Sequence, residues 1–337
     1  MKRSLLRLRV PLRRPFVTAN GVLAERELVV VRLEDDDGTP GWGEAAPLEA
    51  YDGVSVDAVW AALAGGPPAR DAPPQARTAW ELSELDLQAR RRGVALGAVG
   101  AEAIPVNRTL PAGPPEEVAA AAAEGARRGF SCFKLKVGLP DDADRVAAVR
   151  AALGEWPALR VDANGAWSVE EAVERIAELA RFDLELVEQP CATLEELAEV
   201  RGRCPTAIAA DEPIRTAADV RRAAELGACD AVNVKLAGSG GFQPAREALR
   251  AAEEAGMGAW LSSTFDGPWA IAAALQLAAQ ERITLACGLA TLDLFDAPLA
   301  RLLDEPRQGL LHVPTGPGLG VDPPLDALAP LTIDRLD

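Results

Sequence analysis

Three lysines lie in short apolar segments of a chain that otherwise makes little use of lysine. Lys134 and Lys136 stand two residues apart within 133–138, and Lys235 lies in the similar segment 231–236. The chain has 35 lysine and arginine residues in total, and only four of them are lysines. Arginine stays protonated at any accessible pH, whereas a buried lysine can lose its proton and act as a base. The three lysines therefore indicate amine chemistry.

Carboxylates and lysines also recur at regular intervals near the C-terminal ends of apolar segments. The intervals are 26, 26, 23 and 24 residues, in the order Lys136, Asp162, Glu188, Asp211 and Lys235. One strand and one helix of a (β/α) barrel need about as many residues, since about 250 residues make eight such units. We therefore predict that the five side chains meet at one mouth of a parallel barrel. Lys134 is predicted to point inward with Lys136, because residues two apart on a strand share a face.

Three carboxylates on neighbouring strand ends cannot all stay charged in a partly buried site without a cation. Oxygen ligands without histidine favour a hard ion, so Asp162, Glu188 and Asp211 predict a Mg²⁺ site, with Mn²⁺ as the alternative. A carboxylate substrate held there could lose its α-proton to one lysine, while the metal stabilises the enediolate. Like charge from Lys134 predicts a depressed pKa for Lys136.

The segments that would position these residues alternate between strands and amphipathic helices. Capping boxes at 168–171 and 193–196 start two of the helices. We predict an α/β fold, with a (β/α)7β8 TIM-like barrel over 103–314. A doubly wound sheet is the alternative, but no G-x-G-x-x-G follows any of the strands. The predicted strands are 104–107, 132–137, 159–162, 184–188, 207–211, 231–236, 259–263 and 285–289.

Residues 1–102 lack this alternation and predict an α+β capping domain. Three strands near 5–11, 28–33 and 41–44, with an aspartate and glycine turn at 35–38, predict an antiparallel meander. Helices are expected at 56–64 and 76–91, and the segment 315–337 is expected to complete this domain. The connections 17–23 and 48–54 are expected to form a polar lid over the barrel mouth, with the side chains of Thr18, Asn20, Tyr51 and Asp52.

The net charge of -16 argues against nucleic acid or an anionic membrane as a partner. The five cysteines are odd in number and lack zinc-type spacing, which favours a reduced cytoplasm over a disulfide framework. No signal peptide or membrane-spanning run is recognised. The single histidine, His312, excludes a multi-histidine metal site. We expect a cytoplasmic protein that acts on a small carboxylate, and a homo-oligomer is left open.

The motifs taken together resemble the enolase superfamily, muconate-lactonizing subgroup, over nearly the whole chain. The resemblance implies Asp162, Glu188 and Asp211 as Mg²⁺ ligands and Lys134, Lys136 and Lys235 as active-site lysines. It also implies that Asn164 and Asn233 bind substrate and that Glu212 stands behind the metal ligands. The motifs that carry it are Lys134-x-Lys136, Val161-Asp162-Ala163-Asn164-Gly165, Val187-Glu188-Gln189-Pro190, Ala210-Asp211-Glu212-Pro213, Asn233-Val234-Lys235 and 41–48.

Within that subgroup, Ser262-Ser263 and Gly288-Leu289 are similar to the substrate-binding residues of o-succinylbenzoate synthases, which serve menaquinone synthesis. This likeness implies that Lys136 removes a proton and later protonates the leaving hydroxyl, while Lys235 stabilises the intermediate. The segment 264–268 departs from that family. Dipeptide epimerases are the alternative, but Asp293 and Asp296 do not have their Asp-x-Asp spacing. Other cycloisomerases or racemases, and a scaffold without activity, are further alternatives.

Overall fold

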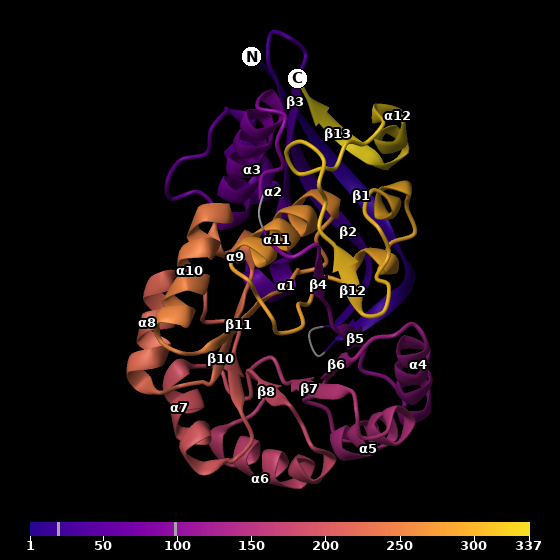
Figure 1. The fold of residues 1–337 in the computed structure, drawn as a ribbon, viewed down its shortest axis with the longest axis vertical. Coiled ribbons are helices and arrows are strands. Elements are labelled where there is room, and N and C mark those ends of the chain that lie inside the picture. The colour runs from indigo at the N-terminus through magenta and orange to yellow at the C-terminus, as the bar shows by residue number, and fades with distance from the viewer. Residues whose placement is uncertain (19–20, 98–99) are drawn as a thin grey trace.

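The computed structural model describes residues 1–18, 21–97 and 100–337 (Figure 1). Its N-terminal part is built on a four-stranded antiparallel sheet in the order β13-β1-β2-β3. The first three strands form the predicted meander, and the predicted return of the C-terminal segment adds the fourth, with Leu5 opposite Leu336. Both ends of the described chain therefore lie at the same end of the molecule (Figure 1). The strands are β1 (Lys2–Thr18), β2 (Gly21–Glu34), β3 (Pro40–Ala45) and β13 (Thr332–Leu336).

Three helices follow the meander: α1 (Glu49–Asp52), α2 (Val56–Ala64) and α3 (Pro74–Arg91). Helix α3 lies directly on β3, where two glycines permit the close approach. A Cβ at Gly43 would lie 1.8 Å from the carbonyl oxygen of Ala79, and one at Gly41 would lie 2.3 Å from that of Ser83. Apolar side chains of the sheet and of α2 and α3, among them Val31 and Leu63, form a core of their own.

A curled parallel sheet of seven strands in the order β11-β10-β9-β8-β7-β6-β5 forms the second part, with helices on its outer side (Figure 1). The segment around Cys287 and Gly288 bridges Val106 and Ser262 at the two edges of this sheet, and so supplies the eighth strand position. The predicted TIM-like α/β fold with an antiparallel capping sheet is thus confirmed. The strands are β5 (Arg108–Leu110), β6 (Cys132–Lys136), β7 (Ala158–Asp162), β8 (Leu186–Glu188), β9 (Ile208–Ala210), β10 (Ala231–Val234) and β11 (Gly258–Leu261).

Capping boxes form at Ser168 and Thr193, as the sequence predicts, and a third forms at Thr216. Among the described residues, no helix is both long and apolar enough to cross a membrane. The helices of this part are α4 (Pro115–Arg127), α5 (Asp142–Leu153), α6 (Val169–Leu179), α7 (Leu194–Arg203), α8 (Ala217–Leu226), α9 (Leu236–Ser239), α10 (Phe242–Glu254), α11 (Pro268–Gln280) and α12 (Leu325–Leu328). The 3₁₀ turns are η1 (Ala180–Phe182), η2 (Leu292–Leu294), η3 (Pro298–Arg301) and η4 (Ala329–Leu331).

The first barrel strand lies later than the predicted 104–107. Residues of β4 (Ala103–Pro105) pair instead with β12 (Leu310–His312), in an antiparallel ribbon outside the barrel. The barrel strand proper runs from Val106 through β5. Arg108 binds Asp293, while Thr109 lines the central cavity. These polar side chains interrupt the apolar pattern of the strand, which is why the sequence predicts a strand in the apolar run just before them.

Buried ionisable side chains join the capping sheet to the barrel. Arg26 on β2 donates to the carbonyl oxygens of Ala46 and Pro47, at 2.7 and 2.8 Å, and to that of Thr264 across the interface at 3.2 Å. Glu44 on β3 accepts from the backbone N–H groups of the first turn of α11. Its carboxyl group thereby satisfies helix donors that have no partner within the helix.

The carboxyl group of Glu44 should make the stability of the protein depend on pH. Burial, together with the charge of Asp266, raises its pKa from 4.5 to about 8. The folded state thus favours the protonated form, so this contribution is complete below pH 4.5 and is lost as the pH rises through 8. We expect the free energy of unfolding to fall by about 1 kcal/mol per pH unit in that window. Urea unfolding at several pH values should show a flatter profile for E44Q, and parallel profiles would contradict the assignment.

Candidate active site

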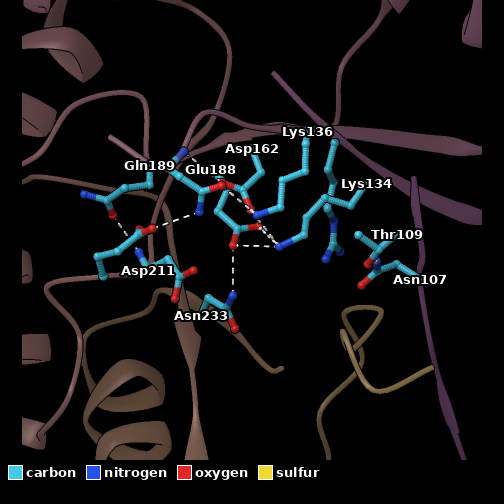
Figure 2. Close-up of polar contacts among 12 residues, drawn as sticks. Asn107, Thr109, Lys134, Lys136, Asp162, Glu188, Gln189, Asp211 and Asn233 are labelled. Carbon is cyan, nitrogen blue, oxygen red and sulfur yellow. Dashed lines mark hydrogen bonds and ion pairs between the residues drawn. The ribbon is translucent and has the colours of Figure 1, made fainter. Parts of the chain in front are cut away.

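Carboxylates from three adjacent strands meet at the C-terminal mouth of the barrel, as the spacing predicts. Asp162 ends β7, Glu188 ends β8 and Asp211 follows β9 directly. Each offers one oxygen atom, and these atoms lie within 4.8 Å of one another (Figure 2). All three side chains are buried. We call Asp162, Glu188 and Asp211 the acidic cluster.

Strand register places Lys136 opposite Asp162, which in turn lies opposite Glu188. The amine of Lys136 donates to Asp162 Oδ2 at 2.6 Å and to Asn164 Oδ1 at 2.7 Å. Lys134, on the same face of β6, reaches Asp162 Oδ2 and Glu188 Oε1, each at 2.9 Å. Asp162 thus separates the two lysines. Its charge lies between the two amines and offsets their like-charge repulsion.

Lys235 follows β10 and reaches the acidic cluster from the other side. Its amine pairs with Asp211 and donates to the hydroxyl of Tyr51 at 2.7 Å. Tyr51 lies in helix α1 of the capping part and also donates to Asp211 Oδ2 at 3.2 Å. The connection 48–54 therefore enters the site through Tyr51. In the other lid segment, Asn20 lies outside the described residues, as does the side chain of Thr18.

The three lysines do not affect the three carboxylates of the acidic cluster equally. Burial alone would raise the pKa of Asp162, but Lys134 and Lys136 hold it below its usual range. Burial raises the pKa of Glu188 and of Asp211 above the usual range. Burial would lower the pKa of Lys134, yet its carboxylate neighbours raise it overall. Burial thus disfavours the charged form of Glu188 and Asp211, and a divalent cation bound between the carboxylates would favour it.

Polar side chains behind the acidic cluster fix its geometry. Asn233 donates to Glu188 Oε1 at 2.9 Å, and Asn164 donates to Glu212 Oε1 at 2.9 Å. Gln189, which the sequence analysis treated only as part of a motif, is fully buried and has a positive φ of 42°. Its Oε1 accepts from the backbone N–H of Asp211 at 2.8 Å. The structure thus brings Asn233 to a cluster carboxylate, and only Asn164 of the two predicted asparagines lines the cavity.

A cavity of about 950 Å³, open to solvent, lies beside the lysines. Ser262, Ser263 and Gly288 line it as predicted. Gly288 is needed there, because a Cβ would lie 2.4 Å from Ser262 Oγ. The other described lining residues, apart from the lysines, Asn164 and Asp211, are mostly hydroxyl-bearing or apolar: Val22, Leu23, Leu48, Ala50, Tyr51, Thr109, Thr264, Phe265 and Thr291.

Leu289, predicted to bind substrate, is not among the described residues that line this cavity. Side chains alternate along a strand, so the neighbour of inward-facing Gly288 faces outward. Leu289 is buried and lines a separate space beside Arg13 and Ala300. Thr109 and Thr291 line the cavity, although neither was among the predicted site residues. Thr109 lies on β5, a strand that apolar runs alone do not place to the residue.

The family model described as "Enolase C-terminal domain-like" matches residues 117–327, more than half of the chain. This chain belongs to the enolase superfamily. It is 39% identical over 310 residues to an o-succinylbenzoate synthase of Thermobifida fusca, covering 90% of this chain and 85% of the relative. The superfamily expected from the motifs is thereby confirmed.

Two superfamily structures share the fold over 99% of this chain and 98% of their own. One is an N-succinyl Arg/Lys racemase from Bacillus cereus, with a TM-score of 0.93 and 25% identity. The other is a dipeptide epimerase from Cytophaga hutchinsonii complexed with Mg and D-Ala-L-Val, with a TM-score of 0.91 and 26% identity. These three relatives are thus an o-succinylbenzoate synthase, a racemase and an epimerase.

Metal binding by this superfamily member can be measured without its substrate. We expect titration calorimetry to show one Mg²⁺ per chain, and E188Q to weaken binding more than about 100-fold, since even residues behind a ligand are worth 10- to 100-fold. The matched control is E174Q, which alters an exposed carboxylate on α6. Circular dichroism should show the same fold in all three proteins. Wild-type Mg²⁺ affinity in E188Q would refute the assignment of the acidic cluster.

Proposed function

We propose that this protein is a Mg²⁺-dependent lyase that forms o-succinylbenzoate from a cyclohexadiene carboxylate with a succinyl side chain, a step of menaquinone synthesis in the cytoplasm. The observation that carries the proposal is the composition of the cavity wall. Among its described residues, the only carboxylate is Asp211, which belongs to the acidic cluster. The remaining wall offers hydroxyl groups and apolar surface, which suit a ring with an uncharged or anionic tail.

The positions of Asp293 and Asp296 support this choice over a dipeptide substrate. A dipeptide presents an ammonium group, which a buried site must pair with a carboxylate. Asp293 is instead held by Arg108 at 2.6 Å and by Arg128 at 3.0 Å. Asp296 uses its backbone N–H to bind Pro11. Neither residue is among those that line the cavity.

In the proposed reaction Asp162, Glu188 and Asp211 would hold Mg²⁺. When bound, the metal supplies Lewis-acid stabilisation of the charge that develops on the substrate carboxylate. The neutral amine of Lys136 takes the α-proton as the C–H bond breaks. The resulting ammonium returns this proton to the departing hydroxyl as the C–O bond breaks, so water leaves and the ring becomes aromatic. Lys235, on the opposite side, stabilises the developing negative charge, and its cation can face the ring.

Racemisation or epimerisation is the second candidate, and the arrangement of the lysines favours it. Lys136 and Lys235 reach the acidic cluster from different strands, and each has a carboxylate partner. A second base on the opposite face is what inversion of an α-carbon requires. The names of the structural neighbours point the same way. This candidate uses the same metal ligands and differs in the part played by Lys235.

The proposed reaction can be assayed directly, because the cyclohexadiene substrate loses its ultraviolet absorbance as it becomes aromatic. We expect turnover with Mg²⁺, none with chelator, and a fall in kcat of at least about 10³-fold in K136A, since the variant lacks the base. K2A is the matched control, because Lys2 is exposed and lies outside the site.

The same proteins should be tested in D₂O with an Ala-Glu dipeptide and with an N-succinyl amino acid. If the protein is the proposed lyase, we expect no epimerisation of the dipeptide at its α-carbon. Absence of cyclohexadiene turnover, together with deuterium entering either α-carbon at a rate that depends on both Lys136 and Lys235, would transfer the protein to the second candidate.

A further inference from the structure

Lys136 and Lys235, two of the three lysines that line the cavity, are held in the same manner by different parts of the molecule. Each amine has one carboxylate of the acidic cluster and one neutral oxygen as partners. For Lys136 the neutral oxygen is Asn164 Oδ1 at 2.7 Å, two residues beyond β7 of the barrel. For Lys235 it is the hydroxyl of Tyr51 at 2.7 Å, in α1 of the capping part.

We propose that Tyr51 is a positioning residue through which the capping part sets the amine of Lys235. The Tyr51 hydroxyl accepts from this amine and donates to Asp211 Oδ2 at 3.2 Å. The same amine lies 4.8 Å from the centroid of the Tyr51 ring. The amine lies beyond the hydroxyl end of the ring, so Tyr51 confines Lys235 by a hydrogen bond from a charged donor.

The helix that carries Tyr51 is itself anchored to the strand end that carries Lys235. Asp52 accepts from two backbone N–H groups of its own turn and from Gln75 Nε2 on α3 at 2.8 Å. One turn further along α3, the hydroxyl of Thr78 donates to Pro74 within the helix at 2.9 Å and lies 3.3 Å from the carbonyl oxygen of Leu236, the residue after Lys235. Helix α3 therefore binds the turn that carries Tyr51 and also packs against the segment that follows Lys235.

Lys136 and Lys235 thus differ in the part of the molecule that supplies their neutral partner. The kinetic effect expected from this difference rests on the proposed function. In the lyase reaction Lys235 stabilises the developing charge, so a poorly placed amine should slow the chemical step without weakening substrate binding. We expect Y51F, which keeps the ring and removes the hydroxyl, to lower kcat about 10- to 100-fold with little change in KM, as for loss of one hydrogen bond to a charged group. Q75L should act in the same direction with a smaller effect.

The contact itself can be tested without any substrate, because Tyr51 is the only tyrosine in the chain. Full-length protein grown with 3-fluorotyrosine should give a single ¹⁹F resonance, recorded with and without Mg²⁺. We expect K235M, which keeps the side-chain length and removes the charge, to shift this resonance. K136M is the matched control and should shift it much less.

The two measurements separate the inference from the reaction. A K235M resonance that does not move, or one that K136M moves equally, overturns the role of Tyr51 whatever the substrate is. A shift specific to K235M supports it even if the cyclohexadiene assay fails. In an active enzyme, Y51F with wild-type kcat, or with a loss confined to KM, also overturns the proposal.

Discussion

Burial of like charges at the barrel mouth is the constraint on which the rest of this structure depends. Three carboxylates without access to bulk water are tolerable only if cations stand between them at fixed distances. Strand register meets this need, since Lys136, Asp162 and Glu188 lie opposite one another on successive strands. Gln189 then fixes the backbone of Asp211, and Asn233 fixes Glu188. The parallel barrel is thus the frame that keeps these charges paired.

Those parts of the fold that repeat along the chain could be predicted from the sequence. Each strand and helix unit has nearly the same length, so the interval from Lys136 to Lys235 indicates a barrel before any strand is placed. Helix starts at Ser168 and Thr193 were predictable because a capping box involves residues only three apart. The ends of the strands were harder to predict from the sequence. Arg108 and Thr109 are polar for reasons of contact, and the facing of Leu289 depends on a register that periodicity does not fix.

Contacts between segments far apart in the chain could not be predicted from a single sequence. The carbonyl partner of Arg26 at Thr264 is one example, because it comes within reach only when β2 packs on the seventh barrel unit. The sequence predicts Tyr51 only as a polar residue of a lid. Its hydrogen bond with Lys235 depends on how α3 packs against both segments, and a single sequence does not show this. The interval pattern concerns residues on successive strands, whereas these contacts join the capping part to the barrel.

The position of β13 has a consequence for how the protein is made. The outer edge of β1 pairs with the last strand of the chain, Leu5 opposite Leu336. A ribosome makes β1 before the barrel and β13 after it, so this edge of β1 gains its partner only once the barrel has been synthesised. An unpaired strand edge is a template for pairing with another chain. Until β13 emerges, this edge is therefore a place where the nascent protein is open to misassembly.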